Sequence, residues 1–178
     1  MLNEELKEQI LQSKLTYLNG YLDALALVCS YSIIGMNFRL FNYKYYSGDI
    51  ERAIRYNSTE LFNVGQNEFD IELIETKNWE ELLKNELYAN LKRRIPFESP
   101  AFASQLDYKE NNLVMDLNYS IRNSINYFIM MLKNEFINET VNVYELKVSR
   151  TFHRIVGIDL IFEIEPTKMI LLQIRGMD

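Results

Sequence analysis

The chain has 178 residues, of which 48% are apolar and 13% aromatic, and its formal net charge is −6. This apolar content is enough for a buried core and argues against a disordered chain. The acidic charge disfavours non-specific nucleic-acid binding, because phosphate backbones repel an acidic surface. The length predicts a single domain over residues 1–178, with a lobe boundary near residues 96–100, where two prolines interrupt the chain.

The cysteine content and the N-terminal residues bear on the cellular compartment. Cys29 is the only cysteine, so the chain forms no internal disulfide and has no cysteine-based metal site, which fits a reducing compartment. Glu4 and Glu5 stand where a secretory signal would be basic. The apolar run 21–35 contains Asp23 and is shorter than the ~20 residues that a bilayer span needs. These features predict a cytoplasmic protein without a membrane span.

Hydrophobic periodicity predicts a long N-terminal helix over residues 4–30, with Asn3 as its N-cap. Its apolar side chains recur every three or four positions, which places them on one helical face. The same periodicity predicts further helices over residues 49–56, 79–94 and 121–136. The apolar face of the N-terminal helix consists of Leu6, Ile10, Leu11, Leu15, Leu18, Leu22, Leu25 and Cys29.

Segments rich in branched and aromatic residues predict the strands. Residues 101–112 are expected to be irregular, with a turn at 109–112, and residues 113–117 form either a short strand or the start of the next helix. The pattern predicts an α+β fold in which the long N-terminal helix and two further helices pack on a mixed or antiparallel sheet of about five strands. The predicted strands cover residues 33–46, 68–76, 141–151, 155–164 and 169–174.

The strongest chemical pattern lies in the last two predicted strands. Gly157-Ile158-Asp159 is followed by Gln173-Ile174-Arg175, and Gln173 lies fourteen positions after Asp159. In outline this resembles the core of the PD-(D/E)xK nuclease superfamily, in which a helix and a strand precede a strand that carries Asp and a strand that carries Glu-x-Lys. Mrr-type restriction endonucleases have Gln in place of this Glu. The resemblance covers about residues 119–175.

This resemblance implies a metal-dependent nuclease, or a degenerate relative of one. Asp159 and Gln173 would then hold Mg²⁺ or Mn²⁺, and Arg175 would stand at the position of the family's Lys. Glu135 or Glu139, late in the preceding helix, would supply a further acid. Such a metal activates water and screens phosphate charge. The alternative is an ordinary edge hairpin whose polar residues face water and which needs no cofactor.

A second cluster of polar residues follows the first C-terminal strand. In an extended segment Arg150 and Arg154 share one face, and Lys147 and His153 share the other. Either face could bind a carboxylate or phosphate group, and a solvated strand end is the alternative. His153 is the only histidine, so a Ser–His or Cys–His catalytic pair would require it.

The acidic charge favours a binding protein over an enzyme. Asp70 and Glu72 share the polar face of a half-buried strand, where they could bind a metal or a basic partner. We therefore expect a small bacterial or phage protein that binds a protein partner with a basic surface, as an inhibitor or immunity protein would. The sequence leaves a homodimer open and disfavours membrane and nucleic-acid partners.

Overall fold

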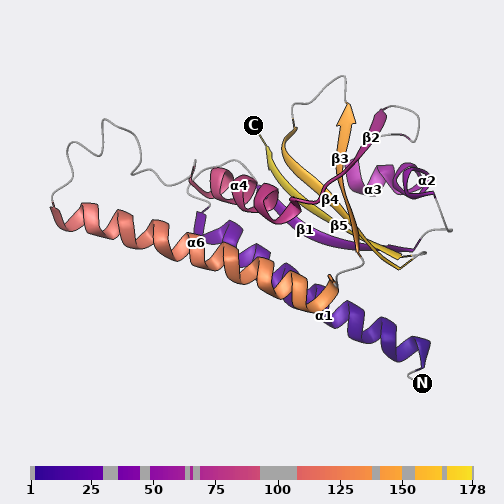
Figure 1. Cartoon of the computed structure of the whole chain (residues 1–178), viewed down its shortest axis with the longest axis horizontal. Helices are drawn as coiled ribbons and strands as arrows, with labels where there is room; N and C mark the ends of the chain where they lie inside the picture. The colour runs from indigo at the N-terminus through magenta and orange to yellow at the C-terminus, as the bar shows by residue number, and fades with distance from the viewer. Residues whose placement is uncertain are drawn as a thin grey trace.

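The computed structural model describes residues 3–29, 36–44, 49–62, 65, 69–92, 108–137, 141–149, 155–165 and 168–177. In this part of the chain, helices cover both faces of a five-stranded antiparallel sheet (Figure 1), which confirms the α+β class. None of the described helices combines the length and the apolar character that a membrane span requires. The predicted lobe boundary at residues 96–100 lies outside the described residues.

The strands are β1 (Met36–Lys44), β2 (Asp70–Glu75), β3 (Asn142–Ser149), β4 (Ile155–Glu165) and β5 (Lys168–Met177), in the order β1-β5-β4-β3-β2. All neighbouring pairs are antiparallel. The β4–β5 hairpin therefore occupies the middle of the sheet, and the alternative of an edge hairpin is wrong. Both faces of these two strands are buried, so their apolar residues run almost without interruption.

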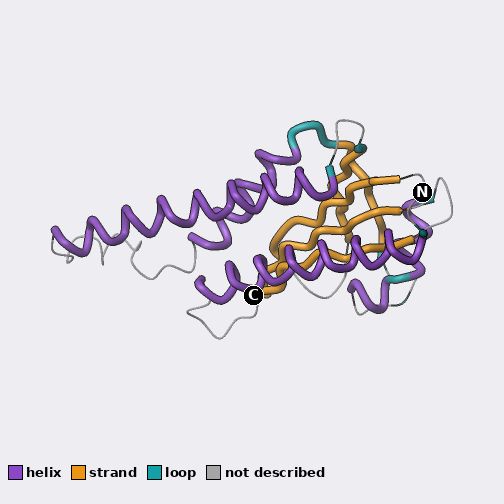
Figure 2. Tube along the Cα trace, turned by 90° about the horizontal axis from the view of Figure 1, so that it is seen from below, coloured by secondary structure: helices purple, strands orange, loops and turns teal. Residues whose placement is uncertain are grey.

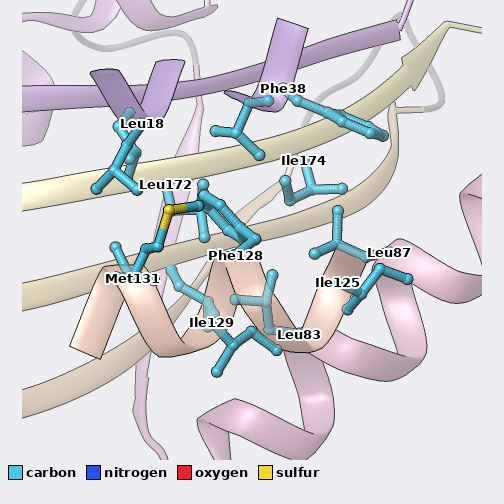
Figure 3. Close-up of a cluster of buried hydrophobic side chains, with 14 of the residues drawn as sticks. Leu18, Phe38, Leu83, Leu87, Ile125, Phe128, Ile129, Met131, Leu172 and Ile174 are labelled. Atoms are coloured by element: carbon cyan, nitrogen blue, oxygen red, sulfur yellow. The ribbon is translucent and has the colours of Figure 1, made fainter. Parts of the chain in front are cut away.

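One face of the sheet is covered by α1 (Glu4–Cys29), α4 (Trp79–Lys92) and α6 (Tyr108–Phe136). Helices α1 and α6 run antiparallel, because Lys14 pairs with Glu135 at one end while the Tyr21 hydroxyl donates to the Ser124 carbonyl further along. Figure 3 shows how the three helices meet the sheet around Phe128. The labelled residues of this core are Leu18, Phe38, Leu83, Leu87, Ile125, Phe128, Ile129, Met131, Leu172 and Ile174.

The other face is covered by two short helices, α2 (Ile50–Tyr56) and α3 (Ser58–Phe62). Helix α2 begins after its N-cap Asp49, whose side chain accepts a hydrogen bond from the Arg52 backbone N–H. The sequence did not predict α3, because five residues are too few to display a helical period. Ile54, Leu61 and Phe62 pack onto the sheet from these helices, so they close a second, smaller core.

Two predictions about the long helices are wrong. Residues 109–112 do not form a turn, because α6 begins at Tyr108 and includes residues 113–117. The first half of α6 extends beyond the sheet (Figures 1 and 2). Of the two alternatives for residues 113–117, the start of the next helix is confirmed. Leu6 and Ile10 do not belong to the buried face of α1, because they are 43% and 42% exposed.

Two glycines give a matched pair of stability predictions. Gly157 in β4 has φ 149°, and a Cβ there would overlap the Ile174 carbonyl oxygen. Gly20 lies within α1, where an added Cβ would meet no atom within 4 Å. We expect Gly157→Ala to lower the free energy of unfolding by more than ~1 kcal/mol, and Gly20→Ala to raise it by ~0.5–1 kcal/mol. Urea denaturation measures both, and equal effects would contradict this reading of Gly157.

Candidate functional site

The structure brings Asp159, Gln173 and Arg175 together, as the sequence pattern predicts. Asp159 on β4 and Gln173 on β5 are direct cross-strand neighbours. Arg175 lies two residues after Gln173 and therefore projects from the same face of the sheet. All three side chains are buried beneath α3, with 8%, 1% and 9% exposure respectively. They form a polar cluster inside the smaller core.

The Arg175 guanidinium is surrounded by acceptors. Its Nε donates to Asp159 Oδ1 at 2.9 Å, and its Nη2 donates to Asp159 Oδ2. Its Nη1 donates to the Leu61 carbonyl oxygen at the end of α3, at 3.0 Å. With its oxygen turned toward the guanidinium, the Gln173 amide accepts from Nη2 at 2.7 Å. The Phe62 ring covers the group at 4.8 Å, so the cation is neutralised and fully hydrogen-bonded.

This geometry decides what Asp159 can do chemically. Both of its carboxylate oxygens already bind a guanidinium that carries the positive charge a metal ion would otherwise supply. A divalent cation would have to displace Arg175 and leave that charge buried without its counter-ion, which is costly. The cluster therefore links the central strands to α3. Arg175 also cannot act as a proton donor of the kind a lysine provides, because its guanidinium stays charged.

The further acids expected beside Asp159 do not join it in the described structure. Glu135 lies on α6, across the sheet from Asp159, and pairs with Lys14 at 2.9 Å. Glu139 lies outside the described residues. Within the described ranges, no three His, Cys, Asp or Glu side chains gather in the way a metal site requires. Sequence spacing could not reveal this, because it does not say which face of the sheet a helix covers.

A second guanidinium, that of Arg55, contacts the chain close to the Arg175 cluster. Arg55 of α2 donates to the Phe69 carbonyl oxygen at 3.0 Å and lies over the Phe69 ring at 5.4 Å. The Phe69 and Phe62 rings meet edge to face, 5.5 Å apart. Arg55 and Arg175 thus fix the two ends of one aromatic pair, which positions α2 and α3 on the sheet.

The predicted acidic residues lie on an open edge of the sheet. Asp70 and Glu72 are exposed on β2, as is Glu75, which was not among the predicted binding residues; of the described strands, β2 pairs with β3 alone. Among the described residues, none of these three carboxylates has an ion-pair partner. Lys147 stands opposite Glu72 in the sheet but pairs with Glu145 at 3.9 Å. The edge is therefore negative and unneutralised.

Tyr144 on β3 is the cross-strand partner of Glu75. Burial raises the pKa of its phenol, and the Glu163 and Glu75 carboxylates on the flanking strands raise it further. A nearby negative charge disfavours the tyrosinate anion, so the two carboxylates act in the same direction as burial.

The two edges of the sheet differ. At β1, the Asn19 side chain of α1 donates to the Leu40 carbonyl at 3.0 Å and accepts from the Leu40 N–H at 2.7 Å. This pair of bonds satisfies the outward backbone groups of Leu40, near the middle of the strand. No described side chain makes a corresponding bond to residues 70–75, so within the described part of the chain the outward backbone donors and acceptors of β2 have no partner beside its three acids.

The sequence did not predict a groove between α4 and α6. Two adjoining hollows of about 300 and 380 Å³ share Lys84 and Asn126. Lys133 pairs with Glu80 at 2.7 Å across the groove, and Arg122 lies over the Tyr88 ring at 4.9 Å. The walls offer amides and charged groups, with no serine, cysteine or histidine among the lining side chains. The groove offers hydrogen-bonding and charged groups to a ligand.

The predicted basic cluster is described only in part. Lys147 is exposed on β3. Arg150, His153 and Arg154 lie outside the described residues, so their grouping stays a prediction.

Comparison with known proteins found no matching family model, no matching curated protein and no matching solved structure. The function must therefore be inferred from the geometry and charge of the chain itself.

The buried ion pair leads to a stability prediction. Asp159→Ala leaves the Arg175 guanidinium buried and unpaired, so we expect it to lower the free energy of unfolding by ~3–5 kcal/mol. The double variant Asp159→Leu/Arg175→Met removes both charges and should cost less than the two single changes together. Lys7→Ala in the exposed Glu4–Lys7 pair is the control, and we expect it to leave the urea midpoint almost unchanged. Additive effects in the Asp159–Arg175 cycle, measured by urea denaturation, would contradict a coupled pair.

Tyr43 on β1 leads to a pH prediction. Burial, followed by the nearby Glu60 carboxylate, raises the pKa of its phenol well above the ordinary value of 10.0. The unfolded chain therefore ionises first, and the stability that the protonated phenol contributes is lost as the pH rises above 10.0. We expect Tyr43→Phe to unfold at a higher pH than the wild type when alkaline unfolding is followed by circular dichroism. Identical profiles would contradict this assignment.

Proposed function

We propose that this protein acts by binding a protein partner with a basic surface, through the open edge of β2. The observation that carries the proposal is the coincidence of two features on one strand. The outward backbone groups of β2 have no described partner, and the three carboxylates of Asp70, Glu72 and Glu75 have no described counter-ion. An extended basic segment satisfies both, because it adds a strand through its backbone and pairs its side chains with the acids.

Electrostatics favours such a partner before contact is made. An acidic surface attracts a basic one over about one Debye length, roughly 8 Å at physiological salt, and this attraction raises the association rate. Acidic side chains on an edge strand also prevent uncontrolled pairing with other chains. These acids therefore disfavour pairing with neutral or acidic strands and favour pairing with a basic one, which makes the edge selective.

An inhibitor or immunity protein is the most specific form of this proposal. Enzymes that act on nucleic acids carry basic surfaces that bind phosphate. An acidic protein that covers such a surface competes with the substrate, so it masks the enzyme without doing chemistry itself. We place the protein in this class, as a bacterial or phage protein that neutralises a basic nuclease or toxin.

A metal-dependent nuclease is the second candidate. The observation that favours it is the direct cross-strand placement of Asp159 and Gln173, which matches the order of ligands in the PD-(D/E)xK core. Both oxygens of the Asp159 carboxylate accept hydrogen bonds from Arg175. A degenerate relative without catalytic activity therefore fits this arrangement better than an active enzyme.

The test of the lead proposal is selection from a displayed library of linear peptides. We expect the wild type to enrich lysine- and arginine-rich peptides whose binding weakens as salt is added. Neutralising β2 with Asp70→Asn, Glu72→Gln and Glu75→Gln should abolish this enrichment. The control variant neutralises three exposed acids elsewhere, Glu5, Asp23 and Glu81, and thus has the same net charge.

The outcomes separate a specific edge from general acidity. Retention of basic peptides by the control variant, with their loss from the β2 variant, supports the proposal. Equal loss from both variants would mean that only net charge matters, and the proposal would fail. Enrichment without any basic bias would also contradict it.

A further inference from the structure

The exposed apolar side chains are concentrated on two helices. Eight large apolar residues are exposed among the described residues, and seven of them belong to α1 or α6. The eighth, Tyr56, lies on α2, the helix that covers the other face of the sheet. Single exposed apolar residues are normal on a protein surface, but a concentration on one pair of helices marks an interaction site. The seven are Leu6, Ile10, Tyr17, Leu27, Tyr119, Tyr127 and Met130.

Helix α6 carries a stripe that points away from the core. Its buried side chains, such as Ile125, Phe128 and Leu132, define the inward face. Residues on the opposite side of the helical wheel recur at spacings of three and four and form one outward row. From Tyr119 to Asn134 this row contains no charged residue, although a quarter of the chain is charged. The row consists of Tyr119, Asn123, Asn126, Tyr127, Met130 and Asn134, all of which are exposed.

The outward row of α6 continues onto α1. The Tyr127 ring lies 5.8 Å from that of Tyr21, and the neighbouring Tyr127 phenol raises the pKa of Tyr17. Ile10 and Leu6 lie on the same side of α1 as Tyr17, at helical spacing. Leu6, Ile10, Tyr17 and the outward row of α6 together form what we call the α1–α6 face.

The α1–α6 face is electrically neutral. Where the two helices meet, Lys14 and Glu135 pair with one another at 2.9 Å and cancel. The rest of the face consists of tyrosine, asparagine, methionine, leucine and isoleucine. Two copies of a chain with net charge −6 repel each other wherever their acidic surfaces meet. Contact through this neutral face avoids that repulsion.

We propose that the α1–α6 face binds a second copy of this chain and forms a two-fold symmetric dimer. The chemistry of the face is self-complementary, as such an interface requires, because each asparagine amide both donates and accepts and can pair with an amide of the other copy. Tyrosine and methionine are enriched at the buried centres of interfaces.

The size of the α1–α6 face can be compared with that of known interfaces. The stripe from Tyr119 to Asn134 spans about 22 Å along the helix axis, and two adjacent helices are about 20 Å wide, which gives a flat area of about 440 Å². Leu6, Ile10 and Tyr17 extend the patch along α1, toward the ~800 Å² per partner of a standard interface. No residue of β2 belongs to the α1–α6 face, so the acidic edges of both copies stay available in the dimer. The inference therefore stands independently of the proposed function.

The test measures the mass of the full chain by sedimentation velocity over a range of concentrations. We expect the wild type to shift toward twice 21.2 kDa as the concentration rises. Tyr127→Glu should keep the protein at the monomer mass, because it places a charge at the centre of the face on each copy. Tyr56→Glu is the matched control, since it changes the same residue type at an exposed position outside the face, and it should still dimerise.

Each other outcome contradicts the proposal. A wild type that stays monomeric at all concentrations overturns it, as does a Tyr127→Glu variant that dimerises as well as the control. Circular dichroism shows whether Tyr127→Glu retains its helices. If it does not, Asn123→Glu puts the same charge on the same row at a polar exposed position, and a dimer that survives this change would refute the α1–α6 face as the contact.

Discussion

The arrangement of the sheet and its smaller core depends on the buried contact between Arg175 and Asp159. The two residues lie on the central strands β5 and β4, and the guanidinium reaches from them to the last turn of α3. A cation in this position must be neutralised, because an unpaired buried charge would cost several kcal/mol. Asp159, Gln173 and the Leu61 carbonyl together meet that requirement. The buried guanidinium needs the Leu61 carbonyl as an acceptor, and this requirement fixes the position of α3 on the strands.

The sequence predicted the elements that display a clear period. Leu15, Leu18 and Leu22 recur at helical spacing and are buried on α1 as expected. Asp159 and Gln173 are cross-strand neighbours on the central strands, a placement that was expected only under the nuclease resemblance. Leu6 and Ile10 fit the same helical spacing but are exposed, because periodicity alone does not locate the edge of a buried stripe.

The role of the polar cluster could not be predicted in the same way. Carboxylate and amide oxygens bind a metal ion or a guanidinium through the same chemistry. Only the three-dimensional position of Arg175 shows which cation is present at Asp159. The expected acid Glu135 belongs to a helix on the other face of the sheet, and the order of residues along the chain carries no information about that face.

The surfaces on which the two proposals rest have opposite character. The β2 edge is charged and has open backbone groups, whereas the α1–α6 face is neutral and its backbone is satisfied within the helices. A charged edge provides steering and selectivity, and a neutral tyrosine-rich face provides apolar contact area. A dimer through the α1–α6 face would present two acidic edges to a partner, which increases avidity when both can engage at once.

The most direct measurement follows the Nε–H resonance of Arg175 by NMR while Mg²⁺ is added to the wild-type protein. The resonance is assigned by its loss in Arg175→Lys. If the guanidinium is the permanent counter-ion of Asp159, the resonance stays slow to exchange with solvent and does not shift as Mg²⁺ is added. A saturable shift with faster exchange would mean that the metal displaces Arg175, which would contradict a structural ion pair and favour the nuclease.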